Sequence, residues 1–119
     1  MSYWTAFSYA TDWSDFGGGY NPGGFKIDGD RVNLRGALKT TATGAWPFTI
    51  ATLPSEAFPP NPVILAAIKM GFDSAGGQVI ACSIVVDTSG NILLEGPGTS
   101  LPTSTEPLSL DGLSFSLLS

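Results

Sequence analysis

The sequence predicts an all-β protein: an antiparallel β-sandwich or jelly roll of about seven or eight short strands, with an extended N-terminal arm. Two observations predict this class. Short apolar runs, several of them alternating with polar residues, are separated by turn sequences at a spacing typical of antiparallel sandwiches. The 119 residues also include 15 Gly and 9 Pro, the two residues least favourable in a helix interior.

The expected strands follow one another from residue 25 onward. Residues 25–28 and 31–35 flank a turn at Gly29-Asp30, and in the second segment Val32 and Leu34 share one face. Gly36 then predicts a bulge or a close approach of the backbone. A further strand is expected at 48–53, followed by a proline-rich loop. Nearly continuous apolar strands are expected at 63–68 and 78–86, and the turn Asp87–Asn91 leads into 92–95. Residues 96–107 are expected to form a loop, and residues 108–110 and 113–117 complete the set.

The N-terminal segment differs in composition from the rest. Residues 1–25 hold eight of the thirteen aromatic residues, together with Gly17-Gly18-Gly19. We therefore expect an arm at residues 1–12, ahead of a single β-sandwich domain at 13–119. Aromatic side chains near a chain end can anchor a partner at low entropic cost. The candidate contact residues are Tyr3, Trp4, Phe7 and Tyr9.

Charge and hydropathy narrow the classes of function. The net charge is −5, and five scattered cations cannot form the basic face that nucleic-acid binding needs. The longest apolar run is too short to span a bilayer, and no signal-peptide pattern begins the chain, so we expect synthesis and folding in a cytosol. Only 13% of residues are charged while 43% are hydrophobic. This balance predicts apolar surface that is covered by other chains.

The residues of catalytic chemistry are sparse. The chain has no histidine, which removes the commonest general base and the usual zinc ligands. Cys82 lies in an apolar run and is expected to be a buried structural thiol. Asp28 and Asp30 are expected to serve turn geometry, with a calcium ligand as the alternative. No cofactor or metal site and no catalytic site is expected.

Four segments occur in an order that resembles a known group of proteins. They are Trp13–Tyr20, Gly29–Gly36, Thr52-Leu53-Pro54 with Phe58-Pro59, and Leu108–Phe115. Together they resemble the small β-sandwich modules at the C-terminal ends of tailed-phage tail fibres and in other virion surface proteins. The likeness covers most of the chain, from about Trp13 to Phe115. It implies a homotrimer of β-sandwiches on the virion exterior without enzymatic activity.

Within that group, two roles are compatible with the sequence. Fibre modules normally follow a long shaft, whereas here the module starts about twelve residues from Met1. We therefore expect a trimeric capsid decoration (cement) protein, made in the host cytoplasm, that binds the major capsid protein on the outer surface of the head. The alternative is a tail-fibre or tail-tip module that recognises host surface saccharide. A carbohydrate-active enzyme is a third possibility, which the missing histidine and unpaired carboxylates disfavour.

Overall fold

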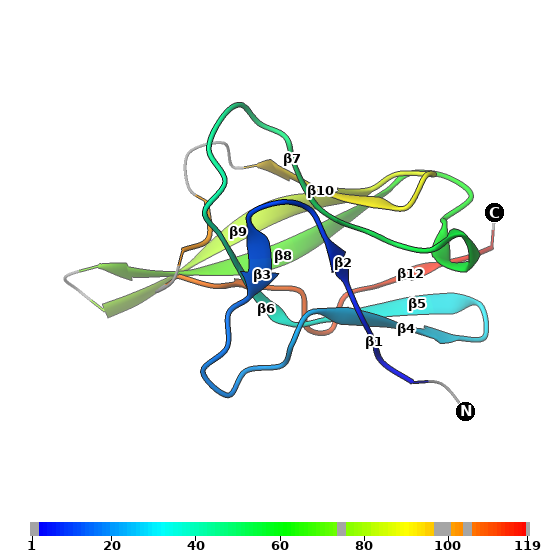
Figure 1. The fold of residues 1–119 in the computed structure, drawn as a ribbon, viewed down its shortest axis with the longest axis horizontal. Coiled ribbons are helices and arrows are strands. Elements are labelled where there is room, and N and C mark those ends of the chain that lie inside the picture. The colour runs from blue at the N-terminus through cyan, green and yellow to red at the C-terminus, as the bar shows by residue number, and fades with distance from the viewer. Residues whose placement is uncertain (1–2, 74–75, 97–100, 104–105, 119) are drawn as a thin grey trace.

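The expected all-β sandwich is confirmed. The computed structural model describes residues 3–73, 76–96, 101–103 and 106–118, and its strands form two antiparallel sheets (Figure 1). The smaller sheet has the order β1-β4-β5-β12, which are Thr5–Ala6, Gly24–Asp28, Arg31–Arg35 and Ser114–Ser116. The larger sheet has the order β2-β7-β10-β9-β8-β11-β6-β3. Its strands are β2 (Ser8–Tyr9), β7 (Phe48–Thr52), β10 (Asn91–Gly96), β9 (Gly76–Val86), β8 (Val63–Asp73), β11 (Leu108–Ser109), β6 (Ala37–Thr40) and β3 (Trp13–Asp15).

The described residues thus contain twelve strands rather than seven or eight. The strands that the sequence did not predict are β1, β2, β3 and β6, which have two to four residues and are too short to leave a clear periodic pattern. β8 and β9 are 11 residues each and pair along their whole length, from Val63–Val86 to Asp73–Gly76. Figure 1 shows this hairpin extending past the rest of the molecule. One 3-10 turn, η1 (Ser55–Ala57), lies in the proline-rich loop after β7. No described helix is long and apolar enough to cross a membrane.

The core lies between the sheets, where the inward-facing side chains of both meet. In β5 the expected alternation is observed: Val32 and Leu34 are buried, while Arg31 is exposed and Asn33 and Arg35 are half-buried. Opposite them, the larger sheet contributes a set of fully buried aliphatic residues from five strands, namely Leu38, Ile50, Ile84, Leu94 and Leu108. Burial of such side chains is the main favourable term for folding, at about 1.5–3 kcal/mol each.

Gly36 makes the close backbone approach that the sequence predicts. Its φ is +122°, a region that favours glycine, and a Cβ there would overlap the backbone of Gly23 and Pro22. The amide of Gly36 is held as well, because it donates a hydrogen bond to Asp111 Oδ1 at 2.8 Å. This contact brings three distant segments together where β5 leads into β6.

The segment expected to be an arm is extended, but it is part of the sandwich. β1 pairs with β4 in the smaller sheet and β2 pairs with β7 in the larger sheet. Between them, Phe7 is only 6% exposed and its ring stacks on Phe25 at 6.4 Å. The boundary expected at residue 12 is therefore not a boundary of the fold. Aromatic density near a chain end does not distinguish partner anchors from core residues, which is why the sequence misled here.

The turn between β9 and β10 is organised by one carboxylate, that of Asp87. It accepts hydrogen bonds from the backbone amides of Ser89 (2.9 Å) and Asn91 (3.0 Å) and from the side-chain amide of Asn91 (3.1 Å). Desolvation acts to raise the pKa of Asp87, but these hydrogen bonds outweigh it and hold that pKa below its ordinary value. The carboxylate therefore stabilises the folded state in its charged form.

Replacing Asp87 by alanine is expected to lower the free energy of unfolding by about 1–2 kcal/mol at neutral pH. Because the pKa is lowered in the folded state, the contribution is complete above the unfolded value of about 3.9. It is lost as the pH falls through the folded-state pKa. Urea unfolding of both proteins across this range measures it, with Asp30→Ala in the exposed β4–β5 turn as the control. A difference between wild type and Asp87→Ala that persists unchanged at about pH 1 would contradict the assignment.

Candidate interaction surfaces

The outer side of the β8–β9 hairpin is an apolar surface open to solvent. Alternation along the two strands directs one set of side chains outward, and this set is called the apolar face: Ile64, Ala66, Ile68 and Met70 of β8, with Val79, Ala81, Ser83 and Val85 of β9. Ile64 is 77% exposed, Val79 69% and Ile68 48%. The apolar face contains no charged residue. Sheets that are solvated on one side normally carry polar residues there, so this face is unusual for a surface in water.

The apolar face is not flat, because it contains a shallow hollow. Beside the projecting Ile64 lies a hollow of about 390 Å³, which is lined by Ile64, Leu65, Ala66, Ala81, Cys82 and Ser83. It exists because Ala66 pairs with Ser83, and Ala81 is the next residue of β9 that faces outward, so that only small side chains point outward here. The face therefore combines protruding branched side chains with a depression of matching chemistry, as tightly packed interfaces do.

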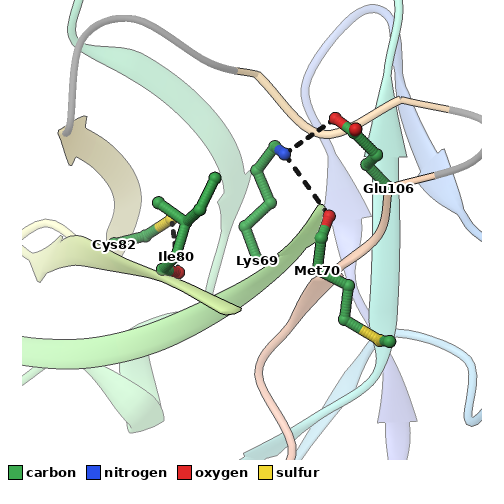
Figure 2. Close-up of polar contacts among 5 residues, drawn as sticks. All are labelled: Lys69, Met70, Ile80, Cys82 and Glu106. Carbon is green, nitrogen blue, oxygen red and sulfur yellow. Dashed lines mark hydrogen bonds and ion pairs between the residues drawn. The ribbon is translucent and has the colours of Figure 1, made fainter. Parts of the chain in front are cut away.

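Beneath this face, β8 carries a charge into the interior. Lys69 points inward and is 1% exposed. Figure 2 shows its Nζ between two acceptors, Glu106 Oε1 at 2.9 Å and the backbone oxygen of Met70 at 3.4 Å. Glu106 comes from the segment before β11, whose Pro107 also accepts a hydrogen bond from Met70 N at 3.0 Å. The ion pair thus ties this segment to β8.

Cys82 is the buried structural thiol that the sequence predicts. It is 3% exposed in β9, and its Sγ lies 3.7 Å from the backbone oxygen of Ile80 (Figure 2). Burial raises the pKa of the Cys82 thiol, with the nearby Lys69 opposing the shift. A protonated, enclosed thiol is a poor nucleophile.

A second surface, on the smaller sheet, is polar and concave. It is called the Trp4 groove, has a volume of about 640 Å³, and is lined by Trp4, Asn21, Lys26, Asp28, Asn33, Leu34, Arg35, Asp111, Gly112 and Leu113. Lys26 and Arg35 lie on the outer face of β4 and β5, with the Lys26 Nζ 5.1 Å and the Arg35 Cζ 4.4 Å from the centre of the Trp4 ring. These cation–π contacts hold the indole against the sheet.

The four predicted contact residues differ in their burial and in their contacts. Tyr3 is 72% exposed, and Trp4 is half-buried at the groove. Phe7 is in the core. Tyr9 is half-buried and donates a hydrogen bond of 2.5 Å to Asp15 Oδ1, which also accepts from the Gly23 amide at 2.7 Å. Burial, reinforced by the Asp15 carboxylate, raises the pKa of Tyr9. The structure therefore unites Phe7 and Tyr9 inside the domain and leaves Tyr3 and Trp4 at the surface.

Two carboxylates that line the Trp4 groove, those of Asp28 and Asp111, are engaged in the fold. Asp28 is 3.5 Å from Lys26 Nζ and accepts from Asn33, in the β4–β5 turn that the sequence predicts. Asp111 accepts from Asn21 and Gly36. Among the described residues, no group of three or more His, Cys, Asp or Glu is placed to hold a metal ion.

These features define a class: a small antiparallel β-sandwich with one apolar and one polar surface of interest. Comparison of the chain with protein-family models, curated proteins and solved structures finds no match.

Proposed function

We propose that this chain is a bacteriophage virion structural protein, a homotrimeric capsid decoration (cement) protein that binds the major capsid protein on the outer surface of the head. The single observation that carries the proposal is the exposed apolar face of β8–β9. A contiguous apolar surface on a small soluble protein is typical of a surface that another chain covers.

The distribution of charge makes a second copy of this chain a suitable partner for the apolar face. Each chain has a net charge of −5, so copies repel one another over most approaches. The apolar face carries no charged side chain, and two or three copies can meet there without opposing like charges. Its projecting Ile64 and Val79 and its hollow of small residues let one copy fill a depression in the next. Closed cyclic symmetry then covers every face, and a threefold assembly suits a local threefold position on a shell.

The capsid contact in this proposal belongs to surface residues near the N-terminus. Tyr3 and Trp4 remain candidates because both are accessible, while Phe7 and Tyr9 are committed to the domain. Decoration stabilises a shell by mass action, since binding occurs only to the assembled state.

Light scattering on the purified chain, followed by mixing with undecorated expanded heads, tests the proposal. We expect a mass of about 37 kDa, three times the chain mass of 12.3 kDa, and co-sedimentation with heads. Ile64→Lys should shift the mass toward the monomer, because each interface would have to bury an ammonium group without a partner. The control is Ser14→Lys, at an exposed position of β3.

The outcomes separate the parts of the proposal. A folded wild-type monomer contradicts trimerisation through the apolar face, as does an Ile64→Lys variant that keeps the trimer mass. A trimer that leaves expanded heads undecorated contradicts the cement role.

The second candidate function is a tail-fibre or tail-tip receptor-binding module. The Trp4 groove favours it, since a concave surface with an aromatic ring and several convergent polar groups is typical of ligand sites. Labelling of virus particles in negative stain distinguishes the two candidates, because heads and tail tips are easily told apart.

A further inference from the structure

We infer that the Trp4 groove is a binding site for a neutral saccharide, with a pyranose ring as the unit bound. The inference goes beyond the proposed cement role and deepens the second candidate function by naming the site and the ligand class. It rests on the composition of the groove, the state of its polar groups and its size.

The charges that line the groove balance. Two cations, Lys26 and Arg35, stand against two carboxylates, Asp28 and Asp111. A polyanion or a polycation would meet as many like charges as opposite ones, so the lining does not select for either. The uncharged amides of Asn21 and Asn33 complete a surface that offers both hydrogen-bond donors and acceptors. A polyhydroxyl ligand, whose hydroxyls both donate and accept, matches this mixture.

Asp111 retains capacity for a ligand although it is engaged. Its Oδ1 accepts from Asn21 and Gly36, while Asp28 is held by Asn33 and Lys26. An ionised carboxylate has about four acceptor sites, so Asp111 can accept further hydrogen bonds. The existing bonds fix the orientation of these groups before a ligand arrives, which lowers the entropic cost of binding.

Arg35 has an unmet donor. Its Nε is buried and has no hydrogen-bond partner, and among the described residues it is the only buried side-chain nitrogen or oxygen in that state. Nε itself is closed off from solvent, so a ligand in the groove would meet the other N–H donors of the guanidinium. Since Arg35 has no acceptor group, this part of the lining suits an oxygen-rich ligand.

Trp4 and two leucines supply the apolar part. The indole is held in place by Lys26 and Arg35, and Leu34 and Leu113 lie in the same lining. A pyranose ring presents apolar C–H groups alongside its hydroxyls, and aromatic side chains combine apolar area with low conformational cost. The volume of about 640 Å³ lies within the range of small-molecule sites.

The test uses the intact chain and four neutral probes: the methyl glycosides of glucose, galactose, mannose and N-acetylglucosamine. Saturation-transfer NMR and calorimetric titration measure binding, and the side-chain resonances of Trp4 and Asn33 report its place. We expect at least one probe to bind saturably and to shift these resonances. Trp4→Ala and Asn33→Ala should each weaken its binding at least about tenfold.

Tyr3→Ala is the matched control, because Tyr3 is the adjacent aromatic residue, is 72% exposed and does not line the groove. Its affinity should equal that of wild type. Thermal unfolding of each variant verifies that it folds, and Asn33→Ala keeps the test valid if Trp4→Ala does not.

Three results would overturn the inference: no saturable binding of any probe at about 10 mM, binding that Tyr3→Ala weakens as much as Trp4→Ala, or binding that leaves the Trp4 and Asn33 resonances unmoved. None of them bears on trimer formation or head binding, which are measured without saccharide. Failure of the cement role and failure of the groove are therefore distinguishable.

Discussion

Replacing Glu106 by alanine is expected to lower the free energy of unfolding by about 3–5 kcal/mol, which is the usual result of removing one partner of a buried ion pair. Glu106 is the partner of Lys69, whose side chain is 1% exposed, while Glu106 itself is 26% exposed. The variant leaves a buried ammonium with the backbone oxygen of Met70 at 3.4 Å. Urea unfolding measures the change, and the melting temperature should fall by about 10 °C or more.

The complementary variant, Lys69→Met, should behave differently. It removes the buried charge, fills similar space, and leaves Glu106 where water can reach it. We expect a change within about 1 kcal/mol of wild type, because replacing a buried charge by an apolar side chain is often neutral or stabilising. Lys39→Met, on the half-buried middle of β6, is the control. Equal losses for Glu106→Ala and Lys69→Met would contradict the account, since they would show that packing rather than an uncompensated charge sets the cost.

Phe7→Ala is expected to destabilise the protein by about 3–5 kcal/mol, the range for truncating a buried phenylalanine. The ring is 6% exposed, stacks on Phe25 and meets Tyr9 edge-on at 5.9 Å. Truncation would leave a cavity beside Phe25, where the chain passes from β1 in one sheet to β2 in the other. Chemical unfolding followed by tryptophan fluorescence measures the loss.

Tyr3→Ala provides the comparison, because it removes an aromatic ring of similar size from the same segment at an exposed site. Its effect should stay within about 0.5 kcal/mol. Similar stabilities for Phe7→Ala and Tyr3→Ala would show that residues 3–9 form a detachable arm after all. The pair also indicates how to probe head binding: Tyr3→Ala removes a surface group, whereas deletion of residues 1–10 removes β1 and β2 and damages the fold.

Much of the fold was predictable because its signals are local. The alternation in β5, the two-residue turn at Gly29-Asp30 and the continuous apolar runs of β8 and β9 are properties of neighbouring residues. The same holds for the carboxylate-centred turn at Asp87. Local geometry alone decides whether such segments extend or turn, so their sequences suffice.

The candidate surfaces were predicted only in outline. An excess of apolar residues indicated that some apolar surface needs a cover, but the sequence could not say where. A nearly continuous apolar run normally indicates a strand that is buried on both sides, and only the packing of the sheets shows that the outer side of β8–β9 is uncovered. The Trp4 groove was not foreseen, because it joins Trp4 to Asn21, β4, β5 and Asp111 across the length of the chain.

By itself, then, the sequence determined the all-β class, the central strands and turns, the buried thiol at Cys82 and the surplus of apolar residues. The tertiary structure alone decided that Phe7 belongs to the core, that Lys69 is buried against Glu106, and that the apolar face and the Trp4 groove exist. The physical reason is the distance along the sequence over which each property is determined. Backbone conformation follows from adjacent residues, whereas burial and the meeting of side chains follow from which sheet covers which.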